Sequence, residues 1–311
     1  MKKLLATATL LATSFVATQA QACWWWEDCT YTKTKYPMVF APGVLGFDKL
    51  VGFVDYWYGI PSALTYSGGK VYTTTASALN SSEARGEQLL SQVQTILAIS
   101  GAQKVNLLGH SHGGFSVRYV ADVIPTKVAS LTLIHSPAKG SPVGDLLVGV
   151  VPAGTAQSFI GSVSDAVMGI IDFLAGNDRP EDSLAALASL TTAGAATFNA
   201  AHTNGMPSTT CGEGAYTANG IKNYSWSGTS SFTNVVDPLD YFFGITGLAG
   251  TEANDGLVGK CSSHFGKVLR DDYPWNHADA INHTFGVQGL FAPDPVDVYR
   301  AHANRLKNAG V

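Results

Sequence analysis

Residues 109–113, Gly-His-Ser-His-Gly, place a serine where it could act as a nucleophile. An apolar run ends just before this pentapeptide, and apolar residues at helical spacing follow it as far as Pro125. In the G-x-S-x-G motif a strand leads into a tight turn and then a helix, and the turn exposes the serine hydroxyl between small neighbours. The pattern therefore predicts a nucleophile elbow that presents Ser111.

A serine hydroxyl needs a histidine to accept its proton and a carboxylate to orient that histidine. In a strand-turn-helix setting of this kind the chain order is serine, acid, histidine. Asp255 lies in a turn-like Asn-Asp-Gly and is a candidate acid, and His277 follows it. Spacing alone does not choose His277 over His264 or His283, so all three stay candidates for the base.

The elements around the serine alternate between short apolar runs and segments with helical spacing. Asn80 and Glu83 form a candidate capping box for one helix, and Gly101 is a candidate stop. Helices alternating with short buried strands are typical of a mainly parallel sheet, so the fold class is α/β. The expected strands lie within residues 36–47, 104–108 and 127–136, and the expected helices within 80–100 and 113–124.

Two regions are less regular. Residues 205–267 are rich in Gly, Ser, Thr and Asn, which favours loops with little regular structure. Residues 153–175 place apolar side chains near one helical face, which fits either a packed amphipathic helix or a mobile cover over an apolar cleft. Neither repeats nor an obvious linker occur, so we expect one domain over residues 23–311.

The N-terminus carries two lysines, an apolar run and an Ala-x-Ala pattern, which predict a secretory signal peptide at residues 1–22. Acylation of Cys23 is a weaker alternative. Four cysteines in an exported chain suggest disulfides, and proximity favours Cys23 with Cys29 and Cys211 with Cys261, although three pairings are possible.

The formal net charge is −4 at pH 7, and this mildly acidic balance argues against nucleic acid as a partner. Beyond the signal peptide, no apolar stretch is long and uncharged enough to predict a transmembrane segment.

Taken together, several segments resemble one family of enzymes. The segments are TKYPMVF, GVLGFD, DYWYGIPSAL, RGEQLL, VNLLGHSHGG, CGEGAY, ANDGLVG and HANRLKN. Their combination resembles the secreted, calcium-dependent triacylglycerol lipases of the pseudomonad type, which have an α/β-hydrolase fold. The resemblance implies that Ser111 is the nucleophile, Asp255 the acid and His277 the base, with the backbone N–H groups of Val44 and His112 forming the oxyanion hole.

The resemblance also implies one structural calcium ion. Its ligands would be the carboxylates of Asp237 and Asp279 and the backbone carbonyls of His283 and Val287. Calcium prefers oxygen ligands, so this set is chemically reasonable. Because Asp279 lies two residues after His277, the ion would anchor the loop that carries the base.

The family likeness further implies a Cys211–Cys261 disulfide, a lid at about residues 153–175 and secretion through the periplasm. The implied partners are a lipid–water interface with its acylglycerol substrate and a lipase-specific foldase chaperone. Three features depart from the family: Pro42 stands where a histidine is common, His283 stands where glutamine is frequent, and the segment CWWWEDC has no counterpart.

We therefore predict a secreted serine esterase that hydrolyses acylglycerols. One alternative is a carboxylesterase for soluble short-chain esters, which would show no gain in rate at an interface. The other is a non-catalytic lipid-binding protein that keeps the hydrolase fold.

Overall fold

The computed structural model describes residues 28–44, 49–50, 54–150, 157–158, 161–163, 165 and 182–311. The predicted signal peptide, Cys23 and most of the predicted lid lie outside these residues. The expectations about them, including the Cys23–Cys29 pairing, stay predictions.

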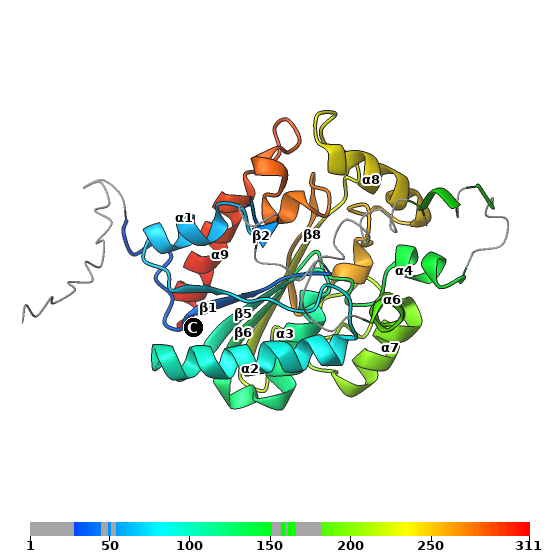
Figure 1. Cartoon of the computed structure of the whole chain (residues 1–311). Helices are drawn as coiled ribbons and strands as arrows, with labels where there is room; N and C mark the ends of the chain where they lie inside the picture. The colour runs from blue at the N-terminus through cyan, green and yellow to red at the C-terminus, as the bar shows by residue number, and fades with distance from the viewer. Residues whose placement is uncertain are drawn as a thin grey trace, which may run out of the picture.

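A seven-stranded sheet forms the centre of the molecule, with the order β4-β1-β5-β6-β8-β7 and with β9 paired to β8 (Figure 1). Every pairing is parallel except that of β7 with β8, so the predicted α/β class is confirmed. The strands are β1 (Met38–Ala41), β4 (Val71–Thr73), β5 (Val105–His110), β6 (Val128–Ile134), β7 (Thr217–Ala218), β8 (Ile221–Gly228) and β9 (Lys267–Tyr273), and a separate pair comprises β2 (Lys49–Leu50) and β3 (Val54–Asp55).

Helices cover both faces of the sheet, because alternate residues of each strand point to opposite sides. Val39 and Ala41 of β1 pack into the cluster formed with α2 (Ser82–Ser100) and α3 (Gly113–Val123). Met38 and Phe40 point the other way, into the cluster that includes α1 (Ile60–Tyr66) and α9 (Pro295–Asn308) (Figure 1). The remaining helices are α4 (Pro142–Leu147), α6 (Ser183–Leu190), α7 (Thr192–Ala201) and α8 (Pro238–Thr246), with 3-10 turns η1 (Pro125–Lys127), η2 (Gly247–Ala249), η3 (Cys261–Ser263), η4 (Asp279–Ile281) and η5 (Thr284–Gly286).

None of the described helices alone is long and apolar enough to cross a membrane. The bent pair Ser183–Leu190 and Thr192–Ala201 passes that test only jointly, on length and composition.

Helix α2 begins one residue later than the predicted capping box required. The side chain of Ser81, not Asn80, caps the helix, because its hydroxyl accepts the N–H of Ala84 at 3.1 Å. Asn80 instead accepts the N–H of Ser81 at 2.8 Å. The helix ends at Gly101 with φ of 65°, as predicted.

The prediction of little regular structure over residues 205–267 is wrong. Strand β8 lies inside the sheet and α8 follows it. Small polar side chains of β8 are buried there because loops supply partners: Ser263 Oγ donates to Ser227 Oγ at 2.7 Å, and the N–H of Phe265 donates to Ser225 Oγ at 3.1 Å. The polar composition of this segment therefore predicted loops where a central strand forms. The predicted Cys211–Cys261 disulfide is confirmed.

Candidate active site

Ser111 lies in the tight turn between β5 and α3, with φ of 55° and only 7% of its surface exposed. The two motif glycines are required by close backbone approach. A Cβ on Gly109 would lie 2.4 Å from the carbonyl oxygen of Gly113, and a Cβ on Gly113 would lie 2.4 Å from that of Ala41. The turn therefore presents the hydroxyl at the carboxyl end of the parallel strands, at the start of α3.

His277 lies beside Asp255, and the structure brings no other predicted base to this carboxylate. The Nδ1 atom of His277 lies 2.8 Å from Asp255 Oδ2, and its buried Nε2 atom has no partner among the described residues. His264 pairs instead with Asp271, and His283 lies in the turn before η5. With Nδ1–H donated to a carboxylate, the Nε2 atom of His277 is left with a lone pair that can accept a proton.

The carboxylate of Asp255 is completely buried and accepts four hydrogen bonds. Its Oδ1 accepts the N–H groups of Leu257 at 2.9 Å and Val258 at 2.7 Å. Its Oδ2 accepts the Nδ1–H groups of His277 and of His135, the latter at 2.7 Å. Burial alone would raise the pKa of Asp255, but the two imidazoles and their hydrogen bonds hold it well below its usual range. The acid is therefore charged at neutral pH.

The loop after β1 lies directly against the serine. A Cβ on Gly43 would lie 2.7 Å from Ser111 Cβ, and the N–H of Gly43 already donates to the hydroxyl of Tyr56 at 2.8 Å. The N–H groups of Val44 and His112 meet no acceptor among the described residues. The side chain of His112 is buried and bonded to Ser82, so its backbone is the part left to contact a substrate.

A buried arginine holds this loop in place. The guanidinium of Arg85 donates to the carbonyl oxygens of Pro42, at 2.8 Å, and Gly43. It also donates to the carbonyls of Ser77 and Ala78, just before α2. The departure at Pro42 is compatible with this arrangement, because proline removes only its own N–H and keeps its carbonyl.

A second network joins this loop to the base. The hydroxyl of Tyr56 lies 2.7 Å from His110 Nδ1, and His110 Nε2 lies 3.0 Å from the carbonyl oxygen of His277. Burial lowers the pKa of His110 well below its usual value, and the neighbouring imidazoles of His277 and His135 lower it further. His110 is therefore neutral, donating to the His277 carbonyl through Nε2–H and accepting from Tyr56 through Nδ1.

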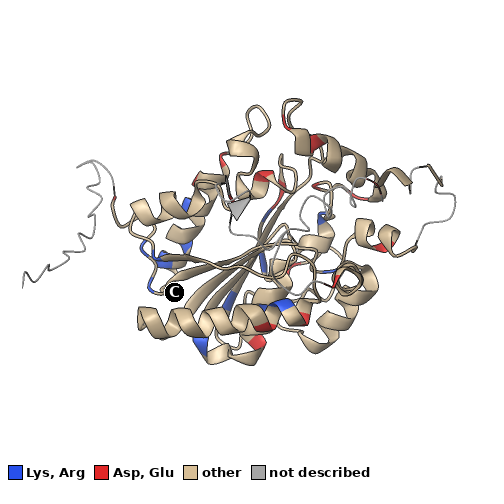
Figure 2. Cartoon of the chain, viewed as in Figure 1, with Lys and Arg blue, Asp and Glu red and all other residues tan. Residues whose placement is uncertain are grey.

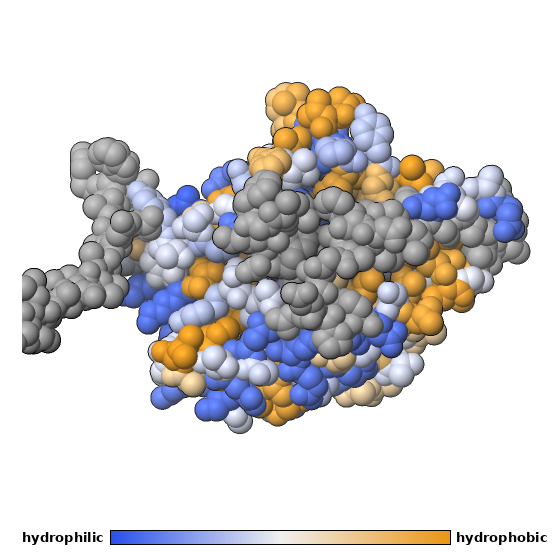
Figure 3. All heavy atoms as spheres, in the orientation of Figure 1, coloured by the Kyte–Doolittle hydropathy of each residue, from blue (hydrophilic) through white to orange (hydrophobic). Residues whose placement is uncertain are grey.

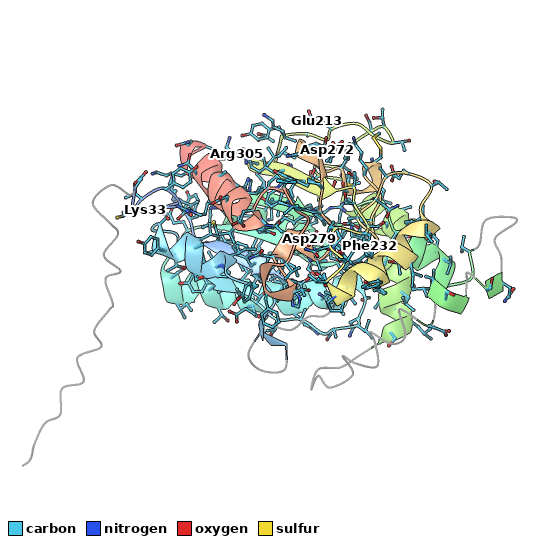
Figure 4. All side chains as sticks on the ribbon, turned by 90° about the horizontal axis from the view of Figure 1, so that it is seen from above. Lys33, Glu213, Phe232, Asp272, Asp279 and Arg305 are labelled. Atoms are coloured by element: carbon cyan, nitrogen blue, oxygen red, sulfur yellow. A yellow bond between two sulfur atoms is a disulfide. The ribbon has the colours of Figure 1, made fainter. Side chains whose placement is uncertain are left out.

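Asp279 belongs to a buried acidic cluster a few residues past the base. Thr233 Oγ1 and the N–H of Asn276 donate to its Oδ2 at 2.9 and 3.0 Å, while its Oδ1 has no partner among the described residues. Figure 4 shows Asp279 near Phe232, on the segment that leads into α8. Burial, with a smaller contribution from the carboxylates of Asp240 and Asp237, raises the pKa of Asp279 to about 7.

Asp237 caps α8 and, like Asp279, has one carboxylate oxygen with a hydrogen-bond partner and one without a described partner. Its Oδ1 accepts the N–H of Leu239 at 2.8 Å, its Oδ2 has no described partner, and burial raises its pKa. The side chain of Thr284 bonds to the same carboxylate, which ties Asp237 to the turn between His283 and Val287. Buried, incompletely satisfied carboxylate oxygens are donors that calcium prefers, so the carboxylates of Asp237 and Asp279 fit the ion.

Five residues of the site were not assigned a role from the sequence: Tyr56, Arg85, His110, His135 and Asp240. Two of them had a detectable signal. His135 follows a buried strand directly, at the same sheet edge as Ser111, and Asp240 lies three residues after Asp237 at the start of a helix.

The chain matches the family described as the alpha/beta hydrolase fold over residues 36–280. It is 52% identical over 283 residues to a triacylglycerol lipase of Vibrio cholerae, covering 90% of each chain. It is also 38% identical over 293 residues to a triacylglycerol lipase of Pseudomonas fragi, covering 89% of this chain and 98% of the other.

Among solved structures, the fold is similar to mature Bacillus licheniformis lipase BlEst2, with a TM-score of 0.58 at 19% identity, covering 82% of this chain and 89% of the other. It is also similar to Staphylococcus hyicus lipase, with a TM-score of 0.56 at 16% identity, covering 89% and 97%. These two likenesses concern the fold alone, whereas the sequence identities extend over nearly the whole chain. On that basis the chain belongs to the bacterial triacylglycerol lipases of the alpha/beta hydrolase fold family.

Proposed function

We propose that this chain hydrolyses the ester bonds of acylglycerols through Ser111, His277 and Asp255. The observation that carries the proposal is the buried His277–Asp255 pair at the sheet edge where the elbow presents Ser111. Family membership supports the same reaction. The two relatives named above at 52% and 38% identity are triacylglycerol lipases.

In the first half of the reaction, Ser111 Oγ attacks the ester carbonyl carbon while His277 Nε2 accepts the hydroxyl proton. Asp255 stabilises the imidazolium that forms. The negative charge on the carbonyl oxygen is stabilised by the N–H groups of Val44 and His112. The tetrahedral intermediate then collapses, the alcohol leaves with the proton from His277 Nε2, and an acyl group stays on Ser111 Oγ.

In the second half, water replaces the alcohol. His277 Nε2 accepts a proton from the water as its oxygen attacks the acyl carbon. The same two N–H groups stabilise the second oxyanion, and His277 returns the proton to Ser111 Oγ as the fatty acid leaves.

An apolar surface near α8 supports an insoluble substrate over a soluble ester. Val235 and Val236 are 68% and 72% exposed before α8, and Leu290 and Phe291 are 83% and 95% exposed after η5. The two loops are adjacent, since the side-chain amide of Asn234 donates to the carbonyl of Gln288 at 2.9 Å. Figure 3 shows apolar atoms gathered over these loop tips.

The described loops that form this surface carry no positive charge. Residues 223–259 and 271–299 contain neither Lys nor Arg, and Figure 2 shows acidic but no basic residues on α8. An exposed, uncharged apolar patch fits a neutral acylglycerol phase better than an anionic membrane. We propose that this end of the molecule contacts the lipid–water interface.

We also propose that Asp237, Asp279 and the carbonyls of His283 and Val287 hold one calcium ion. The ion supplies positive charge for two buried carboxylates and so braces the loop that begins beside His277. We also propose secretion through the signal peptide at residues 1–22, on the pattern of those residues, and folding with the help of a dedicated foldase, on the family resemblance.

The test is the rate of hydrolysis of a triacylglycerol as its concentration passes the solubility limit. We expect the rate to jump at the emulsion boundary, and Ser111→Ala to abolish turnover because it removes the attacking oxygen. Ser116→Ala is the matched control, since Ser116 is a buried serine five residues further along α3.

Three outcomes count against the proposal. Retained activity in Ser111→Ala would remove the serine from the reaction. A smooth saturating curve would indicate a carboxylesterase for soluble esters. Absence of both turnover and labelling by a serine-reactive phosphonate, in folded protein, would indicate a non-catalytic lipid-binding protein.

A further inference from the structure

His135 is a second histidine on the acid that orients the base. It follows β6 directly, its side chain is completely buried, and its backbone has φ of 45°, a left-handed conformation that a residue with a side chain seldom adopts. Its N–H donates to the carbonyl of Trp226 on β8 at 2.9 Å. The chain therefore keeps a bulky side chain at a backbone position that favours glycine or asparagine.

The hydrogen bond of His135 ends on the oxygen that the base uses. His135 Nδ1 lies 2.7 Å and His277 Nδ1 lies 2.8 Å from Asp255 Oδ2. A charged carboxylate can only accept, so both ring atoms carry protons. Burial lowers the pKa of His135, so it makes this contact as a neutral donor and adds no second cation beside an imidazolium at His277.

The surroundings of His135 fit this one contact. A Cβ on Gly228 would lie 2.8 Å from His135 Cε1, so β8 has a glycine where the ring needs space. The ring also stacks on Trp275, two residues before the base, with 6.2 Å between centroids. Its other nitrogen, Nε2, is buried without a partner among the described residues. The bond to Asp255 is thus the polar interaction that this pocket preserves.

Satisfaction of all four acceptor sites explains why such a donor is useful. A carboxylate offers about four lone-pair sites, and the N–H groups of Leu257 and Val258 occupy those on Oδ1. Without His135, one site on Oδ2 would be unsatisfied in a fully buried position, and the carboxylate could turn or admit water in competition with His277.

We propose that His135 is a positioning residue that fixes Asp255 Oδ2 so that its remaining lone pair faces His277. The inference rests on the triad of the proposed function and deepens it. The role of His135 is distinct from catalysis, because His135 contacts the acid and not the reacting atoms.

The test compares His135→Leu, which removes the donor and keeps an apolar side chain of useful size, with His135→Asn. The Asn side-chain nitrogen can occupy the place of Nδ1, and asparagine tolerates a positive φ. We expect kcat to fall about tenfold in His135→Leu with little change in KM, as when an outer partner of a catalytic group is lost. His135→Asn should recover most of that loss.

His302→Leu is the matched control. His302 is also buried, and its Nε2 lies 2.8 Å from Thr132 Oγ1 on β6, away from the triad. Its loss should lower the melting temperature without lowering kcat. A wild-type kcat in His135→Leu would overturn the inference, and so would an equal loss of kcat in His135→Asn. Neither result would affect the triad, which Ser111→Ala tests separately.

A spectroscopic measurement covers the case in which His135→Leu does not fold. In protein with ¹⁵N-labelled histidine, both Nδ1–H protons on Asp255 should resonate at low field. His135→Asn should remove one of the two resonances and leave the other. A single low-field resonance in the wild-type protein that His135→Asn leaves unchanged would overturn the inference.

Discussion

The nucleophile and its acid–base partners are positioned by different kinds of interaction. Around Ser111, backbone atoms of the turn, of α3 and of β1 lie so close that only glycine fits at Gly109 and Gly113. Around His277, the positions depend on hydrogen bonds to buried carboxylates, chiefly that of the His277 ring to Asp255 and that of the Asn276 backbone N–H to Asp279.

The two kinds of interaction differ in range along the chain. The contacts that shape the elbow join residues of one motif and the neighbouring strand β1. The contacts on Asp255 join His135 and His277, which are 142 residues apart in sequence, through a carboxylate in a loop. The elbow should therefore respond to added volume, and the acid–base loops to lost charge or lost hydrogen bonds.

The largest effect we expect comes from Asp255→Asn. The amide is similar in shape but has only one oxygen, and its NH2 group cannot accept. It therefore cannot accept the N–H groups of Leu257 and Val258 and also hold the Nδ1–H tautomer of His277. In serine triads this change lowers kcat by about 10⁴-fold, and we expect a loss of that order in steady-state hydrolysis of a soluble ester.

Asp271→Asn is the control, because Asp271 on β9 also bonds a histidine, His264, at 3.1 Å, but its side chain is partly exposed, unlike that of Asp255. Comparable losses of kcat in both variants would contradict the view that the base depends on the buried carboxylate of Asp255.

The pKa of folded Asp255 is lowered, so its contribution to stability is present above the pKa of the unfolded chain, about 4, and is lost as pH falls further. The stability difference between Asp255→Asn and wild type should therefore shrink as pH falls below about 4.

A steric change at the elbow should have the next largest effect. In Gly109→Ala the new Cβ meets backbone atoms of Gly113 and Gly114 at 2.4 to 2.7 Å, which cannot rotate away as a side chain could. We expect the free energy of unfolding to fall by about 1–3 kcal/mol, as for other overpacked sites. Activity should fall with it, because Ser111 shifts.

Gly289→Ala serves as its control, since a Cβ there would meet its nearest atom, Thr233 Cβ, at an ordinary 3.5 Å. Chemical denaturation and kcat, measured on the same samples, separate the loss of stability from the loss of activity. If Gly109→Ala unfolds at the wild-type denaturant concentration, then volume at the elbow is not what positions the serine.

This difference in range explains what the sequence could and could not predict. The elbow was predictable because a strand, a motif and a helix lie within about twenty consecutive residues. The choice among His264, His277 and His283 was not, since all three follow Asp255 in the chain and only the folded loops decide which one reaches it. The family resemblance, rather than spacing, selected His277.

Two other failures have the same physical origin. Strand β8 was missed because buried Ser225 and Ser227 gain partners from loops about forty residues away. The position of His135 directly after a buried strand indicated a place at the sheet edge, but nothing near it in sequence indicates that a carboxylate 120 residues later will accept its hydrogen bond. Hydrophobic periodicity detects burial of apolar residues but not polar groups whose partners are distant.

The smallest effect we expect is on the thermal stability of the calcium loop. A chelator should lower the melting temperature of the wild-type protein by roughly 5 °C, the shift expected if the ion is present at about a hundred times its Kd. Asp279→Asn should lose most of that difference, because it removes one of the two negative charges whose carboxylates each have an oxygen without a described partner. Asp122→Asn is the control, because Asp122 pairs with His202 just after α7, outside the acidic cluster. Equal melting temperatures with calcium and with chelator in the wild-type protein would contradict the proposed site. A chelator effect that persists in Asp279→Asn would instead locate the ion at other residues, and the loop beside His277 would then be held by its hydrogen bonds alone.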